Sequence, residues 1–285
     1  MPLISRTLTD KIAADFNRVA ELYDDIQAPL SDLVSQRLVE LAKVTPAQSV
    51  LDIGTGTGAA ALAAARVVGS RGSVTGVDIS KGMMTIARRK ASSQGLLNLR
   101  FEETNAASLG FAGGSFDVVI SNLGIPTYLF RDTILEIFRV LKPEGTLCFA
   151  ELVRLSPAWS SLSTVLARYT VKKASPALSA RRKARELMMK EASKFPLSSF
   201  TNVLNSTGFV KVRTFHHTFS VAQPPSGTYL RYLITREYLE YSAMSEGSKR
   251  RFGEEMLRRL EAMHMKSSGQ LKRYVKFWVA EKPVA

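Results

Sequence analysis

The middle of the chain alternates short apolar runs with longer segments of helical composition. The apolar runs span residues 49–53, 72–78, 97–102, 115–121 and 146–152. Three helical segments lie between them, at residues 59–68, 81–94 and 132–141. Runs that are apolar throughout, rather than alternating, are typical of strands buried on both faces. The pattern therefore predicts a parallel, doubly wound sheet within residues 49–151.

The segments on either side have different patterns. Residues 1–48 predict an N-terminal helical cap, and residues 152–208 predict a basic helical lid. Residues 209–285 contain two alternating segments, typical of strands, with a helical insert at about 227–266 between them. The predicted fold is α/β, with a doubly wound, mainly parallel seven-stranded sheet and N-terminal helices. Helical inserts follow strand five and separate strands six and seven.

Composition excludes several classes of protein. The chain has 285 residues, of which 45% are hydrophobic and 22% charged, which is typical of globular proteins. The single cysteine, Cys148, excludes an intramolecular disulfide and leaves too few thiolates for a structural zinc site, so no metal is expected. No apolar run reaches the length of a spanning helix, and the first residues lack the apolar stretch of a signal peptide. We expect a cytoplasmic protein without a transmembrane segment, with peripheral membrane attachment left open.

Positive charge is concentrated outside the predicted sheet. The formal net charge is +14, yet residues 49–151 carry only +1. Residues 168–194 carry +7 and residues 249–276 carry +6. Basic amphipathic helices of this kind lie on anionic membranes, cover an anionic substrate, or expose a solvated face. A nucleic acid is a less favoured partner, because the chain has no recognisable RNA-binding motif.

A glycine turn follows the first predicted strand, in the sequence VLDIGTGTG at residues 50–58. Glycines between a strand and a helix let the backbone approach a nucleotide closely. Gly54, Gly56 and Ala59, with Asp78 further on, also fit a dinucleotide. However, the Asp52 carboxylate would repel a pyrophosphate and attract the ammonium group of S-adenosylmethionine. The turn therefore favours S-adenosyl-L-methionine as the cofactor.

The chain resembles the class I S-adenosylmethionine-dependent methyltransferases over about residues 14–215. The resemblance lies in residues 52–58 (DIGTGTG), the strand ending at Asp78, residues 109–117 (LGFAGGSFD) and residues 139–145 (RVLKPEG). Residues 16–24 (FNRVAELYD) resemble the N-terminal helix of the branch containing the ubiquinone/menaquinone biosynthesis C-methyltransferases. This implies a Rossmann-like methyltransferase fold and an enzyme that uses S-adenosylmethionine.

The resemblance also implies a set of cofactor-binding residues. They are Asp52, Gly54, Thr55, Gly56, Gly58, Asp78, Ile79, Met83, Asn105, Ala106, Asn122 and Leu123. Asp78 would accept hydrogen bonds from both ribose hydroxyls. Met83 would pack on the adenine or belong simply to the core. Asn105 stands where the family usually has Asp, so its contact with the adenine amino group would be weaker.

The candidates for the reaction itself are Tyr23, Asn122, Glu151 and His216. The resemblance puts Tyr23 over the cofactor and Glu151 at the end of strand five. A base is needed only where the acceptor must lose a proton, and His216 or its neighbour His217 could then serve. Adjacent strand residues point to opposite faces, so at most one of the two histidines can do so. Tyr23 as a packed aromatic and Asn122 as a turn residue are the alternatives.

We therefore expect methyl transfer to a small lipidic or aromatic acceptor, with carbon, oxygen and nitrogen all open as the methylated atom. An RNA methyltransferase is one alternative, although residues 122–125 (NLGI) replace the Asn/Asp-Pro-Pro-aromatic motif of enzymes that methylate amino groups of bases. A non-catalytic protein and a dinucleotide-binding protein with the same fold are the others. In the lid, Trp159, Leu162, Leu166 and Tyr169 are expected to form an apolar wall facing the crevice. Arg181, Arg182, Lys183 and Arg185 are expected on the outer rim or against an anionic head group.

Overall fold

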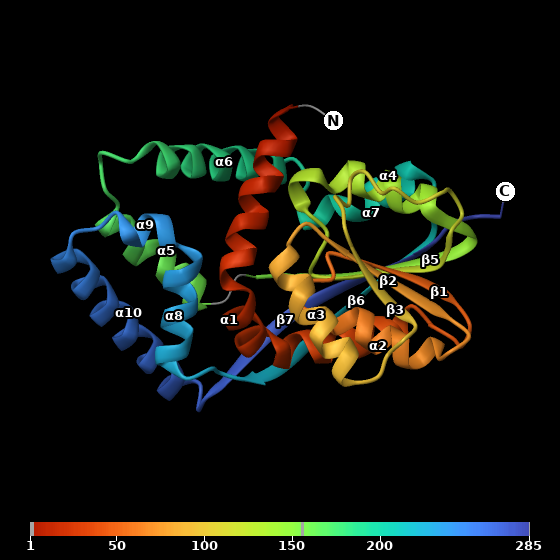
Figure 1. Ribbon diagram of the computed structural model, residues 1–285, viewed down its shortest axis with the longest axis horizontal. Coiled ribbons are helices and arrows are strands. Elements are labelled where there is room, and N and C mark those ends of the chain that lie inside the picture. Colours follow the sequence, from red (N-terminus) through yellow and green to blue (C-terminus); the bar gives the residue numbers. More distant parts are fainter. Residues whose placement is uncertain (1–2, 155–156, 285) are drawn as a thin grey trace.

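The computed structural model describes residues 3–154 and 157–284, which form a seven-stranded sheet with helices on both faces (Figure 1). The strands are β1 (Ser49–Ile53), β2 (Ser73–Asp78), β3 (Leu99–Glu103), β4 (Phe116–Asn122), β5 (Leu141–Leu152), β6 (Val210–Ala222) and β7 (Gln270–Glu281). Their order in the sheet is β3-β2-β1-β4-β5-β7-β6. Only β7 runs antiparallel to its two neighbours, β5 and β6. The predicted fold class is confirmed.

The helices fall into two groups, those that cover the sheet and those inserted beside it. The helices of the sheet domain are α2 (Ala59–Val68), α3 (Lys81–Ser93), α4 (Phe130–Val140) and α7 (Phe200–Thr207), with the short 3₁₀ turns η1 (Thr127–Leu129) and η2 (Leu197–Ser199). The inserted helices are α5 (Pro157–Tyr169), α6 (Pro176–Ser193), α8 (Ser226–Arg236), α9 (Tyr238–Ser242) and α10 (Glu246–Lys266). No helix in the described part of the chain is long and apolar enough to cross a membrane.

The N-terminal segment is a single helix, α1 (Leu3–Leu41), where the sequence indicated more than one. It continues through Pro29 because each half is held by a different part of the molecule. Leu30 and Leu38 are buried against the sheet and α2. Val19 and Ile26 are buried with the inserted helices. Helix α1 therefore runs between the sheet and the inserts and joins them (Figure 1).

The predicted apolar wall of the lid belongs mainly to the core of the inserted helices. Leu162 and Leu166 of α5 are buried in a cluster that includes Tyr229 of α8 and Met256 of α10. The structure has a cavity of about 580 Å³ and, beside it, a smaller one of about 210 Å³. Leu162 and Leu166 line the smaller cavity and not the larger one. The predicted position of these leucines is thus wrong, because α5 packs its apolar face on α10. The Trp159 side chain lies outside the described residues.

The sheet reverses its order of strands between β1 and β4, at the centre of the molecule. Strands β2 and β3 extend to one side of β1, and β4 and β5 extend to the other. At such a switch point the loops after the strands diverge and leave a crevice at the carboxyl edge. The residues that follow β1, β2, β4 and β5 therefore meet in one place.

Candidate functional site

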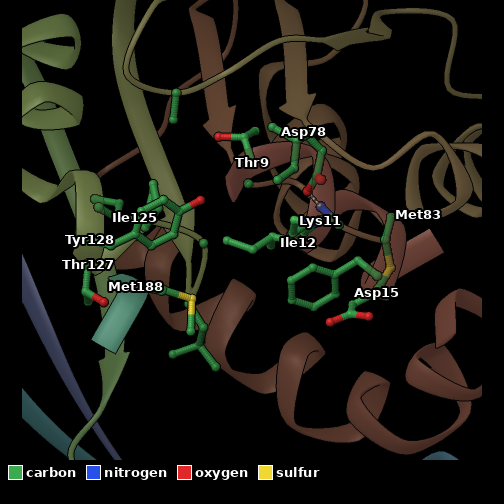
Figure 2. A pocket seen from close by; sticks show the side chains of 18 of the residues that line it. Thr9, Lys11, Ile12, Asp15, Asp78, Met83, Ile125, Thr127, Tyr128 and Met188 are labelled. Atoms are coloured by element: carbon green, nitrogen blue, oxygen red, sulfur yellow. Dashed lines mark hydrogen bonds between the residues drawn. The ribbon is translucent and has the colours of Figure 1, made fainter. Parts of the chain in front are cut away.

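A cavity of about 580 Å³ lies at this carboxyl edge. Its floor comes from the ends of β1, β2, β4 and β5, and its cover comes from α1, α6 and the end of α8. Figure 2 shows Ile12 of α1 extending toward Tyr128 and Met188, with Thr9 and Asp78 near each other on another side. Long helices thus close a space that the sheet alone would leave open to water.

Two glycine-containing turns touch each other in the floor. A Cβ added to Gly54 would lie 2.5 Å from the carbonyl oxygen of Gly124. A Cβ added to Gly124 would lie 2.5 Å from the carbonyl oxygen of Ile53. Gly54 and Gly56 also have positive φ angles of 64° and 54°, which favour glycine. Both positions of the contact therefore require glycine. The sequence analysis did not single out Gly124, whose only signal was a glycine just after an apolar run.

Asp52 supports the first turn from behind. It is almost fully buried, and its Oδ2 accepts hydrogen bonds from Thr55 Oγ1 at 2.7 Å and from the Ala61 N–H at 3.0 Å. Burial raises the pKa of Asp52 to about 7, although these two bonds lower it. Asp52, Thr55 and Gly58 lie outside the cavity lining. They shape the turn in this structure, whereas the sequence analysis expected them to contact the cofactor.

Asp78 stands at the end of β2 and lines the cavity. Its Oδ2 accepts a hydrogen bond from the Gly56 N–H at 2.9 Å, and its Oδ1 accepts one from the Ser80 N–H at 2.8 Å. Burial raises the pKa of this carboxyl above its ordinary value. Because a carboxylate oxygen has two lone pairs, both oxygens can accept further bonds from a ligand.

The structure brings nine of the twelve predicted cofactor residues to the cavity. They are Gly54, Gly56, Asp78, Ile79, Met83, Asn105, Ala106, Asn122 and Leu123. The Oδ1 atom of Asn105 accepts a hydrogen bond from the Ala107 N–H at 2.9 Å, so part of its polar capacity holds its own loop. Met83 is both a core residue and a lining residue, which reconciles the two roles that the sequence left open.

Asn122 joins the floor to α1. Its Nδ2 donates to the carbonyl oxygen of Ser31 and to Ser35 Oγ, both at 2.9 Å. Its Oδ1 is buried and has no partner among the described residues. Leu123 next to it has a φ of 56°, a strained value for a residue with a side chain. A buried acceptor without a partner in a cavity lining is suited to a ligand that donates a hydrogen bond.

Tyr23 of α1 and Glu151 of β5 both line the cavity. The Glu151 carboxyl makes no hydrogen bond or ion pair with any described residue, and burial raises its pKa to about 8. Burial also raises the pKa of Tyr23 far above its ordinary value, with smaller contributions from Tyr232 and Asp78. Burial raises the pKa of Tyr128 to about 12. At neutral pH the site therefore holds proton donors in a water-poor space.

His216 is not brought to this cavity. It lies exposed in the middle of β6, opposite Lys276 of β7, and His217 beside it is also exposed. The strand continues to Ala222 and forms the outer edge of the sheet, away from the switch point. The structure gives no support to a general base at either histidine.

The cover contains residues that the sequence analysis assigned elsewhere. Arg181, Ala184, Arg185 and Met188 line the cavity at intervals of three and four residues, so one face of α6 forms its roof. Arg181 is largely buried and so does not lie on the predicted outer rim, whereas Arg185 keeps an exposed side chain at the edge of the cavity; Glu237 pairs with both of them. Glu237 lies more than fifty residues away, so no local pattern indicated this pairing.

The adjacent Arg182 points to another acidic residue. It forms a two-pronged ion pair with Glu240 of α9, with both Nε–Oε1 and Nη2–Oε2 at 2.7 Å. Glu240 is buried, so the charge of Arg182 is matched inside the protein and not presented to a membrane. Of the predicted basic cluster, Lys183 alone is exposed without an ion pair in the described part of the chain.

The donors and shapes in the cavity fit S-adenosylmethionine. The Gly54–Gly124 contact leaves backbone exposed for close approach, and Asp78 offers carboxylate oxygens suited to a pair of hydroxyls. Asn122 lines the same end of the cavity, although its Oδ1 is buried. Ile79 and Met83 supply an apolar surface for an aromatic base.

Comparison with known proteins identifies a family and several relatives. The model of the ubiE/COQ5 methyltransferase family matches residues 6–228. The demethylmenaquinone methyltransferase of Listeria welshimeri is 26% identical over 224 residues, covering 75% of this chain and 94% of that one. The ubiquinone/menaquinone biosynthesis C-methyltransferase UbiE of Hydrogenovibrio crunogenus is 32% identical over 152 residues, 51% of this chain and 60% of that one.

The solved structures show the same fold at low sequence identity. The YcgJ protein of Bacillus subtilis aligns with a TM-score of 0.54 and 18% identity. The alignment covers 89% of this chain and 100% of that one. Likeness at this level of identity concerns the fold alone.

Proposed function

We propose that this protein methylates a small aromatic acceptor of the quinol type. The premise is that the chain belongs to the ubiE/COQ5 methyltransferase family and is an S-adenosylmethionine-dependent methyltransferase. The observation that carries the proposal is the cavity itself, which runs from Asp78 and the glycine turns to the uncompensated carboxyl of Glu151. Relatives named for demethylmenaquinone and for C-methylation in ubiquinone and menaquinone biosynthesis support a quinol ring as the acceptor.

S-adenosylmethionine, when bound, supplies an activated methyl group. In this proposal Asp78 binds the ribose hydroxyls, and Ile79, Met83, Asn105 and Ala106 surround the adenine. Gly54, Gly56 and Leu123 line the methionine end, where Asn122 Oδ1 accepts a hydrogen bond. Asp52, Thr55 and Gly58 act as positioning residues, because their hydrogen bonds and packing hold the turn.

Glu151 is the proposed general base. A phenolic acceptor must lose a proton as its ring carbon or oxygen gains a methyl group, and a carboxylate in a dry cavity can accept it. A base works best when its pKa lies near the operating pH, and burial raises that of Glu151 to about 8. Tyr23, whose pKa burial keeps high, stays protonated and would donate a hydrogen bond to the acceptor oxygen.

Helices α1 and α6 supply orientation and exclude water. Asn122 fastens α1 to the end of β4 through Ser31 and Ser35, and Arg181 fastens α6 to α1 through Asp15. Ile125 and Met188 give the acceptor an apolar surface. Holding the acceptor still in a closed space is most of what methyl transfer asks of a protein.

The charge pairing in the cover disfavours the alternative of an RNA methyltransferase. Arg181 and Arg182, two members of the basic cluster that would meet a phosphate backbone, are paired with Asp15, Glu237 and Glu240. Pairing of this kind lowers the charge that these two arginines offer for counterion release.

The test is radiolabelled S-adenosylmethionine supplied with 1,4-dihydroxynaphthalene under anaerobic conditions, with bulk RNA in a parallel reaction. We expect label in the naphthalene product and none in RNA. Label appearing in RNA, or failure of the protein to bind S-adenosylhomocysteine in calorimetry, would overturn the proposal.

A further inference from the structure

One end of the cavity carries a cluster of charged residues. Arg181 and Arg185 line the cavity there together with Asp15 and Glu237. The two arginines share the Glu237 carboxylate, and Arg181 also pairs with Asp15. Asp15 is in addition shared with Arg18, which lies 3.0 Å away. This end of the cavity therefore favours a ligand with negative charge.

All three nitrogen atoms of the Arg181 guanidinium donate hydrogen bonds within the protein. Its Nε bonds to Asp15 at 3.1 Å and its Nη1 to Glu237 at 2.9 Å. Its Nη2 donates to the carbonyl oxygen of Arg236 at 3.0 Å. Arg181 thus joins α6, α1 and α8, and its role is to build the cavity wall.

Arg185, one helical turn further along α6, is only partly used. Its Nη1 bonds to the two carboxylate oxygens of Glu237 at 3.0 and 3.2 Å. Its Nε and Nη2 atoms make no hydrogen bond with any residue that the structure describes. Glu237 is buried and already shared with Arg181, so it orients Arg185 without neutralising it. One edge of the guanidinium plane is left for another partner.

Arg185 is placed where an acceptor would reach it. It follows Ala184 and precedes Met188 on the face of α6 that forms the roof. It also lies, with Ser163 and Glu237, where the main cavity adjoins the smaller cavity of about 210 Å³. A ring bound beneath Met188 can therefore direct a substituent toward Arg185 and past the apolar side chain of Leu166.

We propose that Arg185 binds a carboxylate carried by the methyl acceptor, so that the enzyme prefers an acidic aromatic compound to a neutral one of the same ring size. The inference rests on the proposed function, since it assigns the acceptor to this cavity. The open Nε–Nη2 edge of a guanidinium matches the two oxygens of a carboxylate in a planar, two-pronged pair. Arg185 is then a specificity-determining residue, and Glu237 is the residue that positions it.

The experiment compares two probes that differ by one carboxylate, 1-hydroxy-2-naphthoate and 1-naphthol. Their dissociation constants are measured by calorimetry on the full chain saturated with S-adenosylhomocysteine. The proteins are wild type, Arg185→Gln, Arg185→Lys and the control Lys183→Gln, which removes one exposed charge from the same helix outside the cavity.

We expect wild type and Lys183→Gln to bind the naphthoate at least about tenfold more tightly than the naphthol. Arg185→Gln should lose this preference, because only its affinity for the naphthoate should fall. Arg185→Lys should retain part of the preference, because lysine keeps the positive charge but lacks the planar guanidinium that makes a two-pronged pair. Equal affinity of wild type for the two probes would overturn the inference without any variant. So would an Arg185→Gln protein that keeps the preference. Failure of wild type to bind S-adenosylhomocysteine would instead contradict the proposed function.

Discussion

The carboxylate of Asp78 accepts a hydrogen bond from the backbone N–H of Gly56 at 2.9 Å. The residue that ends β2 thereby holds the glycine turn that follows β1, and both line the same cavity. A single side chain is thus able to shape the turn and to bind the ligand that the turn receives.

Replacing Asp78 with Ala should weaken binding of S-adenosylhomocysteine by at least about tenfold, because hydrogen bonds to a charged group contribute about 1.5–3 kcal/mol each. Isothermal calorimetry measures the effect. Glu102→Gln on the exposed face of β3 is the matched control, since it removes a carboxylate outside the cavity. Unchanged affinity in a folded Asp78→Ala protein would contradict the proposed ribose site.

Replacing Gly124 with Ala should destabilise the protein by about 1–3 kcal/mol or more, since the new Cβ would lie 2.5 Å from the Ile53 carbonyl oxygen. Whatever protein folds should bind S-adenosylhomocysteine more weakly, because the two floor turns must move apart. Urea unfolding and calorimetry give the two readouts. Gly110→Ala is the control, since a Cβ there meets nothing within 4 Å. Equal stability of the two variants would argue against the contact.

Methyl transfer to a phenolic acceptor should speed up as the pH rises through about 8, where Glu151 loses its proton and can act as a base. Glu151→Gln should lower kcat about a hundredfold or more and remove this pH dependence. Its affinity for S-adenosylhomocysteine should stay nearly the same, which serves as the internal control. A Glu151→Gln enzyme that keeps the wild-type pH profile would exclude this base.

The same carboxyl should make the protein less stable in alkali. Burial raises the pKa of Glu151 to about 8 in the folded chain, so its contribution to stability is present below its unfolded pKa and is lost as the pH rises through 8. Glu151→Gln should therefore unfold at higher urea than wild type at pH 9, by about 1–3 kcal/mol. The two proteins should differ least near pH 4. Asp52, whose pKa burial raises to about 7, should make the variant lose stability as well, but over the lower range of pH that ends near 7.

Arg182→Gln should destabilise the protein by about 1–3 kcal/mol, because it leaves the buried Glu240 without its charged partner. Attachment to vesicles containing anionic lipid should not change, since this guanidinium already faces a carboxylate inside the protein. Lys183→Gln should have little effect on stability, because the Lys183 side chain is exposed and forms no ion pair with any described residue. A loss of vesicle binding in Arg182→Gln with normal stability would restore the membrane role that the sequence suggested for this cluster.

The sequence alone was sufficient for the features that depend on neighbouring residues. Apolar runs predicted the first five strands and alternating segments predicted the last two, and the glycine turn and Asp78 were located by their places at strand ends. Ser80 is the N-cap of α3, and its Oγ accepts a hydrogen bond from the Met83 N–H. These signals are local, because strand periodicity, helix caps and tight turns involve residues a few positions apart.

Only the tertiary structure decided the features that depend on packing between distant segments. Strand order put His216 at the outer edge of the sheet, although its strand was correctly identified. Helix α6 brought Arg181 and Arg185 over the cavity because Glu237, on the other insert, is buried against them. A local sequence pattern gives the amphipathic character of such a helix but not the partner that its charges will meet. The core of the fold and most of the residues that line the cavity near Asp78 were therefore accessible from sequence, whereas the part of the cavity near Arg185 was determined by how the two helical inserts pack on α1.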